Sequence, residues 1–238
     1  MNIGVGINEN VVIKAAVIND KKRLELELIE ATKVGAVKKS VFDTMLTART
    51  SEESTSFKLN IFGPLLPKKE DQSTEKKIEL IGNDFTKIVK QLSQILEQFI
   101  PVDSIDLDSL DIQFANTGIV DDSTLQARML DQDVINRIYD NISTRFVALI
   151  NPFVGSADNA VRFKLIRQSK DKHYASIPGK FISDNPFIEL MTVPADQSRV
   201  KFTKYELEQG LDNGTPIASD KAEVKQTAAA EVNPFAPQ

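Results

Sequence analysis

Cationic and aromatic side chains alternate with apolar ones in several short segments of this 238-residue chain. Lysine and arginine bind phosphates and flat rings stack on bases, which is the combination that non-specific binding of single-stranded nucleic acid requires. The most basic segment, 161–180, holds six lysines or arginines against one aspartate, a net charge of +5. This pattern indicates a positive local field, and its alternative interpretation is a solvated strand face without a ligand.

Strand parity selects the candidate residues, because successive side chains of a β-strand point to opposite faces. In 57–62 and 161–165 the odd-numbered residues are apolar and predicted to face the core, so the even-numbered residues face outward. The predicted nucleic-acid-binding residues are Lys14, Lys58, Phe62, Arg162, Lys164, Arg167, Lys172 and Tyr174. Partial burial is an equally good interpretation of the two rings, and lysines on strands often serve only to protect an edge. Glu25 and Glu27 also contribute acid to any shared face.

The residue types exclude most catalytic and metal chemistries. The chain has no cysteine and a single histidine, His173, which excludes disulfide scaffolds, cysteine zinc sites and thiol catalysis. Asp103, Asp106, Asp108 and Asp111 offer oxygen ligands, but their spacing is not that of an EF-hand, and we interpret them as a solvated acidic loop. No Walker or dinucleotide-binding motif is present. We therefore expect a protein that is not an enzyme, with no cofactor and no metal site.

Two classes of element follow from the spacing of apolar residues. Segments with alternation or β-branched composition predict five strands, at 11–20, 23–31, 56–63, 161–168 and 172–178. Residues 19–22 predict a hairpin turn, and 199–207 a last strand or a short arm. Helical spacing predicts one helix that starts at a cap on Asn83 or Asp84 and ends at Pro101. A second helix is predicted from 121 or 123 to 150.

This order of elements predicts an α+β fold. We expect an OB-like five-stranded antiparallel barrel, or a strongly curved sheet, with a helical insertion between strands 3 and 4. The domain would span 1–210, with the helical block 83–150 inserted, and 211–238 would be a flexible C-terminal tail. A mixed sheet with helices on one side, or a small barrel with a separate helical subdomain, are the alternative architectures.

Several stretches of the sequence also resemble a known family. They are GVGINENVVIK (4–14), NPFVG (151–155), HYASIPGKF (173–181), NPFIELMTVP (185–194) and KFTKYE (201–206). These stretches resemble bacteriophage proteins that bind single-stranded DNA during replication. The resemblance implies an OB-like core and a mobile C-terminal tail that contacts replication proteins. Tails of that family are typically acidic with a terminal aromatic residue, whereas 219–238 has a net charge of −1 and three residues follow Phe235.

The net charge of the whole chain, −5, argues against a nucleic-acid ligand only when it is read as one number. Residues 81–160 alone carry a net charge of −7, so the acid lies in the predicted helical block. We expect a non-sequence-specific binder of single-stranded DNA in phage replication or recombination. A virion structural or assembly protein is the alternative, and a regulator whose acidic block mimics nucleic acid is a third. With no apolar run that could span a membrane and no signal peptide, we expect no membrane partner and a place in the cytoplasm, of the host if viral.

Overall fold

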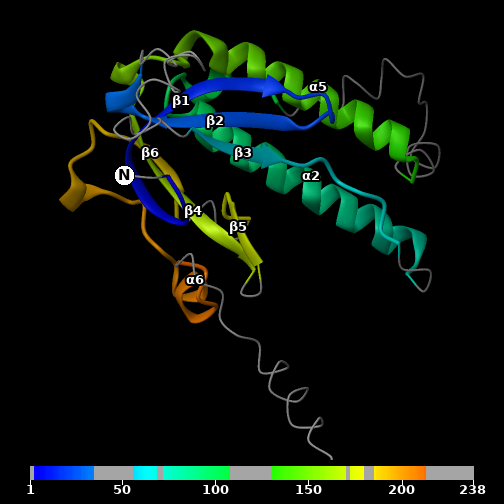
Figure 1. Ribbon diagram of the computed structural model, residues 1–238. Helices are drawn as coiled ribbons and strands as arrows, with labels where there is room; N and C mark the ends of the chain where they lie inside the picture. The colour runs from blue at the N-terminus through cyan, green and yellow to red at the C-terminus, as the bar shows by residue number, and fades with distance from the viewer. Residues whose placement is uncertain are drawn as a thin grey trace, which may run out of the picture.

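The computed structural model describes residues 3–34, 56–68, 72–107, 130–169, 172–179 and 185–212 (Figure 1). The strands are β1 (Gly6–Ile18), β2 (Leu24–Glu30), β3 (Phe57–Ile61), β4 (Val161–Ser169), β5 (Lys172–Ser176) and β6 (Ile188–Leu190). The helices are α2 (Thr74–Leu96), α5 (Gln132–Ile150) and α6 (Lys204–Glu208). Along the chain, α2 and α5 come between β3 and β4.

The sheet is antiparallel and strongly curved because its longest strand is shared between two partners. The strand order is β3-β2-β1-β4-β5, and β6 pairs with β4. The first part of β1 pairs with β4 over Gly6–Val11, and the later part pairs with β2 over Val11–Ile18. A bulge at Lys14 bends the strand between these ladders. The two ends of the order, β3 and β5, approach each other, so the sheet is a nearly closed barrel and the predicted α+β class is confirmed.

The core lies between the inner face of this sheet and the two long helices. The predicted alternation in β2 is confirmed, because Leu24, Leu26 and Leu28 are all fully buried. In β3, Leu59 and Ile61 are buried in the same cluster. The apolar faces of α2 and α5 close the cluster, and the helices lie side by side along the β1–β2–β3 part of the sheet (Figure 1).

Both long helices begin at positions that apolar spacing did not reveal. Helix α2 starts about ten residues earlier than predicted, at Thr74, where the Ser73 hydroxyl accepts a hydrogen bond from the Lys76 N–H. Its first turns are charged and largely exposed, so they carry no apolar stripe. Helix α5 starts after Asp131, whose carboxylate accepts from the Asp133 N–H. The prediction of one continuous helix from 121 or 123 is therefore wrong, and 108–129 lie outside the described residues.

The C-terminal part of the described chain also differs from the prediction. Residues predicted as a last strand or arm contain the short helix α6, held by a capping box between Thr203 and Glu206. Strand β6 was not predicted, because three residues are too few for a visible alternation. The predicted tail is outside the described residues beyond Asp212. Within the described residues, no helix combines the length and the apolar character that crossing a membrane requires.

Candidate nucleic-acid-binding groove

A groove of about 1070 Å³ opens where β3 and β5 fail to close the barrel. One wall is β3 together with the residues that follow it, to Leu65, and another is β5. The floor includes a face of α2 from Asp84 to Gln91, and the C-terminal segment contributes Tyr205 and Leu211. Gly4 and Val5, and Ile166 and Gln168 of β4, complete the lining, so the groove collects residues that are far apart in sequence.

Four aromatic residues line the groove; Phe57 is only partly exposed, and the other three are exposed to solvent. Phe62 is 54% exposed and Tyr174 is 72% exposed, so each ring is partly covered, as the alternative interpretation has it, and each still leaves more than half of its surface open to solvent. Tyr205, which is 37% exposed, is the third exposed ring in the lining. Sequence reasoning missed Tyr205, because nothing in the pattern of 199–207 shows that this segment folds back against β4 and so reaches the groove.

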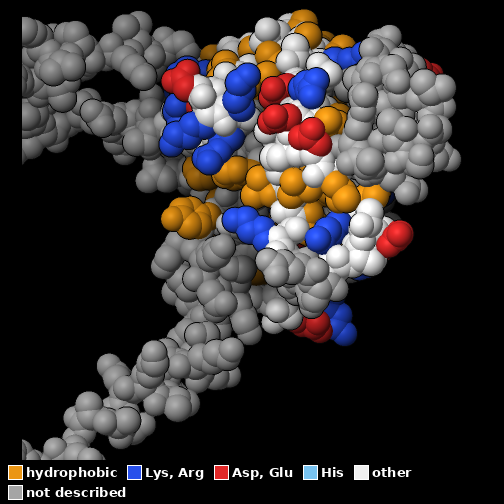
Figure 2. Space-filling view, turned by 90° about the vertical axis from the view of Figure 1, so that its right-hand side faces the viewer, with side chains coloured by type: hydrophobic (Ala, Val, Ile, Leu, Met, Phe, Trp, Pro, Cys, Tyr) orange, Lys and Arg blue, Asp and Glu red, His pale blue; other side chains and the backbone are white. Residues whose placement is uncertain are grey.

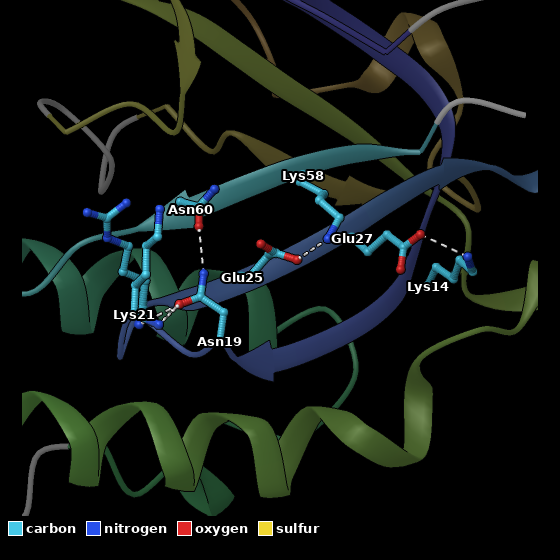
Figure 3. A network of polar contacts seen from close by, with 8 residues as sticks. Lys14, Asn19, Lys21, Glu25, Glu27, Lys58 and Asn60 are labelled. Atoms are coloured by element: carbon cyan, nitrogen blue, oxygen red, sulfur yellow. Dashed lines mark hydrogen bonds and ion pairs between the residues drawn. The ribbon is translucent and has the colours of Figure 1, made fainter.

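The turn between β1 and β2 places the Arg23 guanidinium beside the Phe62 ring. Asn19 organises this turn, because its side-chain oxygen accepts hydrogen bonds from the Lys21 and Arg23 N–H groups. The Asn19 amide nitrogen donates to the Asn60 side-chain oxygen at 3.3 Å, which ties the turn to β3 (Figure 3). The Arg23 guanidinium carbon lies 4.7 Å from the centroid of the Phe62 ring. Arg23 was not among the predicted binding residues, yet it makes a cation–π contact with a ring that lines the groove.

The outer face of β1, β2 and β3 carries two ion pairs. Lys58 Nζ lies 2.8 Å from Glu25 Oε1, and Lys14 Nζ lies 2.8 Å from Glu27 Oε1 (Figure 3). Hydrogen bonding by Lys14, followed by the Ser56 side chain, lowers the pKa of Glu27. The predicted exposure of Lys14 and Lys58 is confirmed, and so is the presence of acid on the same face. Each of these lysines therefore already has a carboxylate partner that a phosphate would have to replace.

The three cations predicted on β4 do not lie at the surface. Arg162 is 3% exposed, and Lys164 and Arg167 are fully buried, so the prediction that they line an open strand face is wrong. The reason is that β6 and the segment 198–212 cover this side of β4. A cation can be buried at tolerable cost only when it is paired and hydrogen-bonded.

Each of these buried cations has a partner in the protein. Arg162 donates to Glu9 at 3.2 Å and to Glu189 at 3.0 Å. Lys164 Nζ donates to Glu206 Oε2 at 3.0 Å and to a backbone carbonyl in the covering segment. Arg167 donates to the backbone carbonyl of Gly210. Desolvation lowers the pKa of Lys164, and the contact with the Glu206 carboxylate opposes that shift.

The remaining predicted residues are only partly described. Lys172 lies on β5, but its side chain and that of His173 are outside the described part of the structure. Of the four clustered aspartates, Asp106 pairs with Arg145 at 3.1 Å. Across the described ranges, no group of three or more histidine, cysteine, aspartate or glutamate side chains is placed to hold a metal ion.

The surface at the end of the molecule that carries the β1–β2 turn shows how hydrophobic and charged side chains are distributed. Figure 2 shows a band of hydrophobic side chains with lysine and arginine side chains on both sides and a small acidic group among them. No family model matches this chain, and neither the curated proteins nor the solved structures that were compared with it give a match. The chemistry of the groove is therefore the basis for assigning a function.

Proposed function

We propose that this protein binds single-stranded DNA without sequence specificity, in the groove between β3 and β5. The observation that carries the proposal is the exposure of Phe62 and Tyr174 in this groove, with Arg23 against the first ring. Base stacking on aromatic rings tolerates any sequence, because every base has a π-face, and nearby cations attract the backbone.

The strand connections support an OB-like assignment of the barrel. An OB-fold is a five-stranded, partly open barrel whose face on strands 2 and 3 and whose neighbouring loops bind oligonucleotides. In this chain β1 lies between β2 and β4, β3 and β5 flank the opening, and the β1–β2 turn carries Lys21, Lys22 and Arg23. The groove therefore lies beside the strands and the turn through which that fold binds its ligands.

The groove assigns separate roles to rings and cations. Phe62 and Tyr174 stack on bases, while Arg23, Lys58 and Lys87 contact phosphates at the rim. Arg162, Lys164 and Arg167 have no direct role, because their ion pairs and hydrogen bonds are internal. The resemblance to phage replication proteins supports a role in replication or recombination in the cytoplasm of a host, with partners bound through the tail.

Fluorescence anisotropy of a labelled oligo-dT across a salt series tests the proposal. We expect tight binding at low salt that weakens steeply as salt rises, because binding releases counterions from the strand. Duplex DNA and single-stranded RNA in the same series define the preference. Absence of oligo-dT binding even at the lowest salt would contradict the proposal.

Two substitutions locate the binding surface. Phe62→Ala and Tyr174→Ala should each weaken oligo-dT binding about tenfold, because each removes a stacking partner, and should leave the salt dependence unchanged. Val102→Ala is the matched control, since Val102 is 65% exposed and does not line the groove. Equal affinities for all three variants would place the binding surface elsewhere.

One feature favours a second function, assembly through protein–protein contacts, as in a virion protein. Leu65 lines the groove and is 72% exposed, and an aliphatic side chain adds little to base stacking. Mass spectrometry of purified particles separates the two functions, because a structural protein is present at high copy number. Leu65→Ala should weaken assembly strongly if this second function holds and oligo-dT binding only slightly if the first does.

A further inference from the structure

The hydroxyl of Tyr139 bridges two strands at the end of the β2–β3 ladder. Leu24 and Ile61 are directly opposed in that ladder. The Leu24 N–H donates to the Tyr139 hydroxyl at 3.0 Å, and the hydroxyl donates to the Ile61 carbonyl. Burial raises the pKa of Tyr139, which keeps this oxygen protonated and able to donate. One side-chain oxygen from α5 thus joins the donor of one strand to the acceptor of its neighbour.

This bridge lies next to the Arg23–Phe62 contact in the groove. Arg23 immediately precedes Leu24, and Phe62 immediately follows Ile61. Leu24 and Ile61 are therefore the last paired residues of the ladder before the guanidinium and the ring. Beyond Phe62, the chain passes directly over the Tyr139 ring. A Cβ atom added to Gly63 would lie 2.8 Å from Tyr139 Cγ, closer than real Cβ contacts allow. The tyrosine therefore contacts the residues on both sides of Phe62.

We propose that Tyr139 is a positioning residue that holds Arg23 and Phe62 in the arrangement that a base stacks on. This role rests on the proposed function, because it concerns the ring that would receive the base. Tyr139 itself is 3% exposed and cannot contact a ligand, so it acts only through the ends of β2 and β3. The reason for a hydroxyl at this point, rather than a wholly apolar ring, is the pair of backbone groups that it satisfies.

A tryptophan reporter measures this role directly. The chain has no tryptophan, so Phe62→Trp makes the groove ring the sole source of tryptophan emission. In full-length protein, adding Tyr139→Phe removes only the hydroxyl. We expect lower emission anisotropy at position 62, because the ring is held less firmly, and about threefold to fivefold weaker binding of oligo-dT with an unchanged salt dependence.

Ile142→Val in the same reporter protein is the matched control, since Ile142 is a buried residue on the same helix. It should lower stability without changing the anisotropy or the emission maximum. Gly63→Ala places a methyl group against the Tyr139 ring and should displace it. Like Tyr139→Phe, it should lower the emission anisotropy and weaken oligo-dT binding. It tests the positioning role if Tyr139→Phe does not fold.

The positioning role is overturned if Tyr139→Phe leaves the emission of the reporter tryptophan unchanged, or if Ile142→Val changes it equally. The two proposals fail in different ways. If oligo-dT does not alter the emission in any background, the binding function is contradicted. The anisotropy of the free protein still decides whether Tyr139 positions the ring.

Discussion

Two strand faces that look alike in the sequence have opposite environments in the fold. On β4, Arg162 and Lys164 alternate with apolar residues, and Lys58 on β3 and Phe62, the residue after β3, do the same. The β4 cations are buried beneath the C-terminal segment, whereas Lys58 and Phe62 are exposed beside the groove. Alternation separates the two sides of a strand, but it does not show which side a later part of the chain covers.

The partners of the β4 cations explain what the covered face does. Glu189 lies on β6, 27 residues beyond Arg162, and Glu206 lies 42 residues beyond Lys164, in the segment 198–212 that covers β4. The ion pairs thus anchor that segment, which in turn brings Tyr205 and Leu211 to the groove. The basic strand β4 affects the candidate site through this anchoring and not through contact with a ligand.

The strongest test of this difference is the removal of a buried cation. Lys164→Ala leaves the Glu206 carboxylate buried without its charge partner, and Glu206 is also a member of the capping box of α6. We expect the free energy of unfolding to fall by about 3–5 kcal/mol, because removing one partner of a buried ion pair leaves the other charge buried without compensation. Urea unfolding measures this loss.

A control on the same helix separates burial from charge. Lys204 pairs with Glu208 at 3.7 Å, but both side chains are well exposed, so Lys204→Ala should change stability by less than about 0.5 kcal/mol. For whatever fraction of Lys164→Ala remains folded, the salt dependence of oligo-dT binding should equal that of the wild type. A reduced salt dependence with full stability would show instead that Lys164 contacts phosphate.

Much of the sheet could be predicted from the sequence, because its strands obey a local rule. The segments 23–31 and 56–63 alternate strictly, and the burial of Leu26 and Leu59 follows from that alternation. The turn at 19–22 was also predictable, since a cluster of polar residues separates two strand patterns. These features depend on neighbouring residues alone.

The site could be predicted only in part, because it depends on contacts between distant segments. Phe62 and Tyr174 were found by parity, and the groove brings them together. Arg23 was missed because its place in the site depends on its contact with the Phe62 ring. Tyr205 was missed because it reaches the groove only through the path of the C-terminal segment. Arg162 was misplaced for the same reason, because its cover comes from β6, which has no visible pattern of its own.

A smaller effect, on DNA binding, is expected from removing the carboxylate of Glu25 on the exposed face of the sheet. Glu25→Gln removes the carboxylate that holds Lys58 and frees that ammonium for a phosphate. We expect oligo-dT binding at low salt to tighten about threefold, with a steeper salt dependence by up to about 0.7 in the log–log slope. Anisotropy titrations over a salt series measure both quantities.

Asp106→Asn is the matched control for Glu25→Gln. It removes the same charge from a surface ion pair, with Arg145, that does not line the groove. It should tighten binding much less than Glu25→Gln does. Equal tightening by the two variants would mean that only the net charge of the protein matters, and the exposed face would then have no special part in binding.

The smallest effect concerns Glu27, whose ion pair with Lys14 is partly exposed, in contrast to the buried pair of Lys164. The folded-state pKa of Glu27 is lowered from its ordinary value of 4.5, chiefly by the hydrogen bond from Lys14. The folded state therefore favours the ionised form, so the stabilisation is fully present above the unfolded-state pKa and is lost as the pH falls through the folded-state pKa.

Urea unfolding of the wild type and of Glu27→Gln measures this contribution. We expect the wild type to be more stable by less than about 1 kcal/mol at about pH 6.5, and this difference to shrink towards zero near about pH 3. Glu79→Gln, which breaks a more exposed pair with Lys76, should change stability at neither pH. A difference for Glu27→Gln that persists undiminished in acid would come from packing and not from charge. The ion pair between Glu27 and Lys14 would then add nothing measurable to stability.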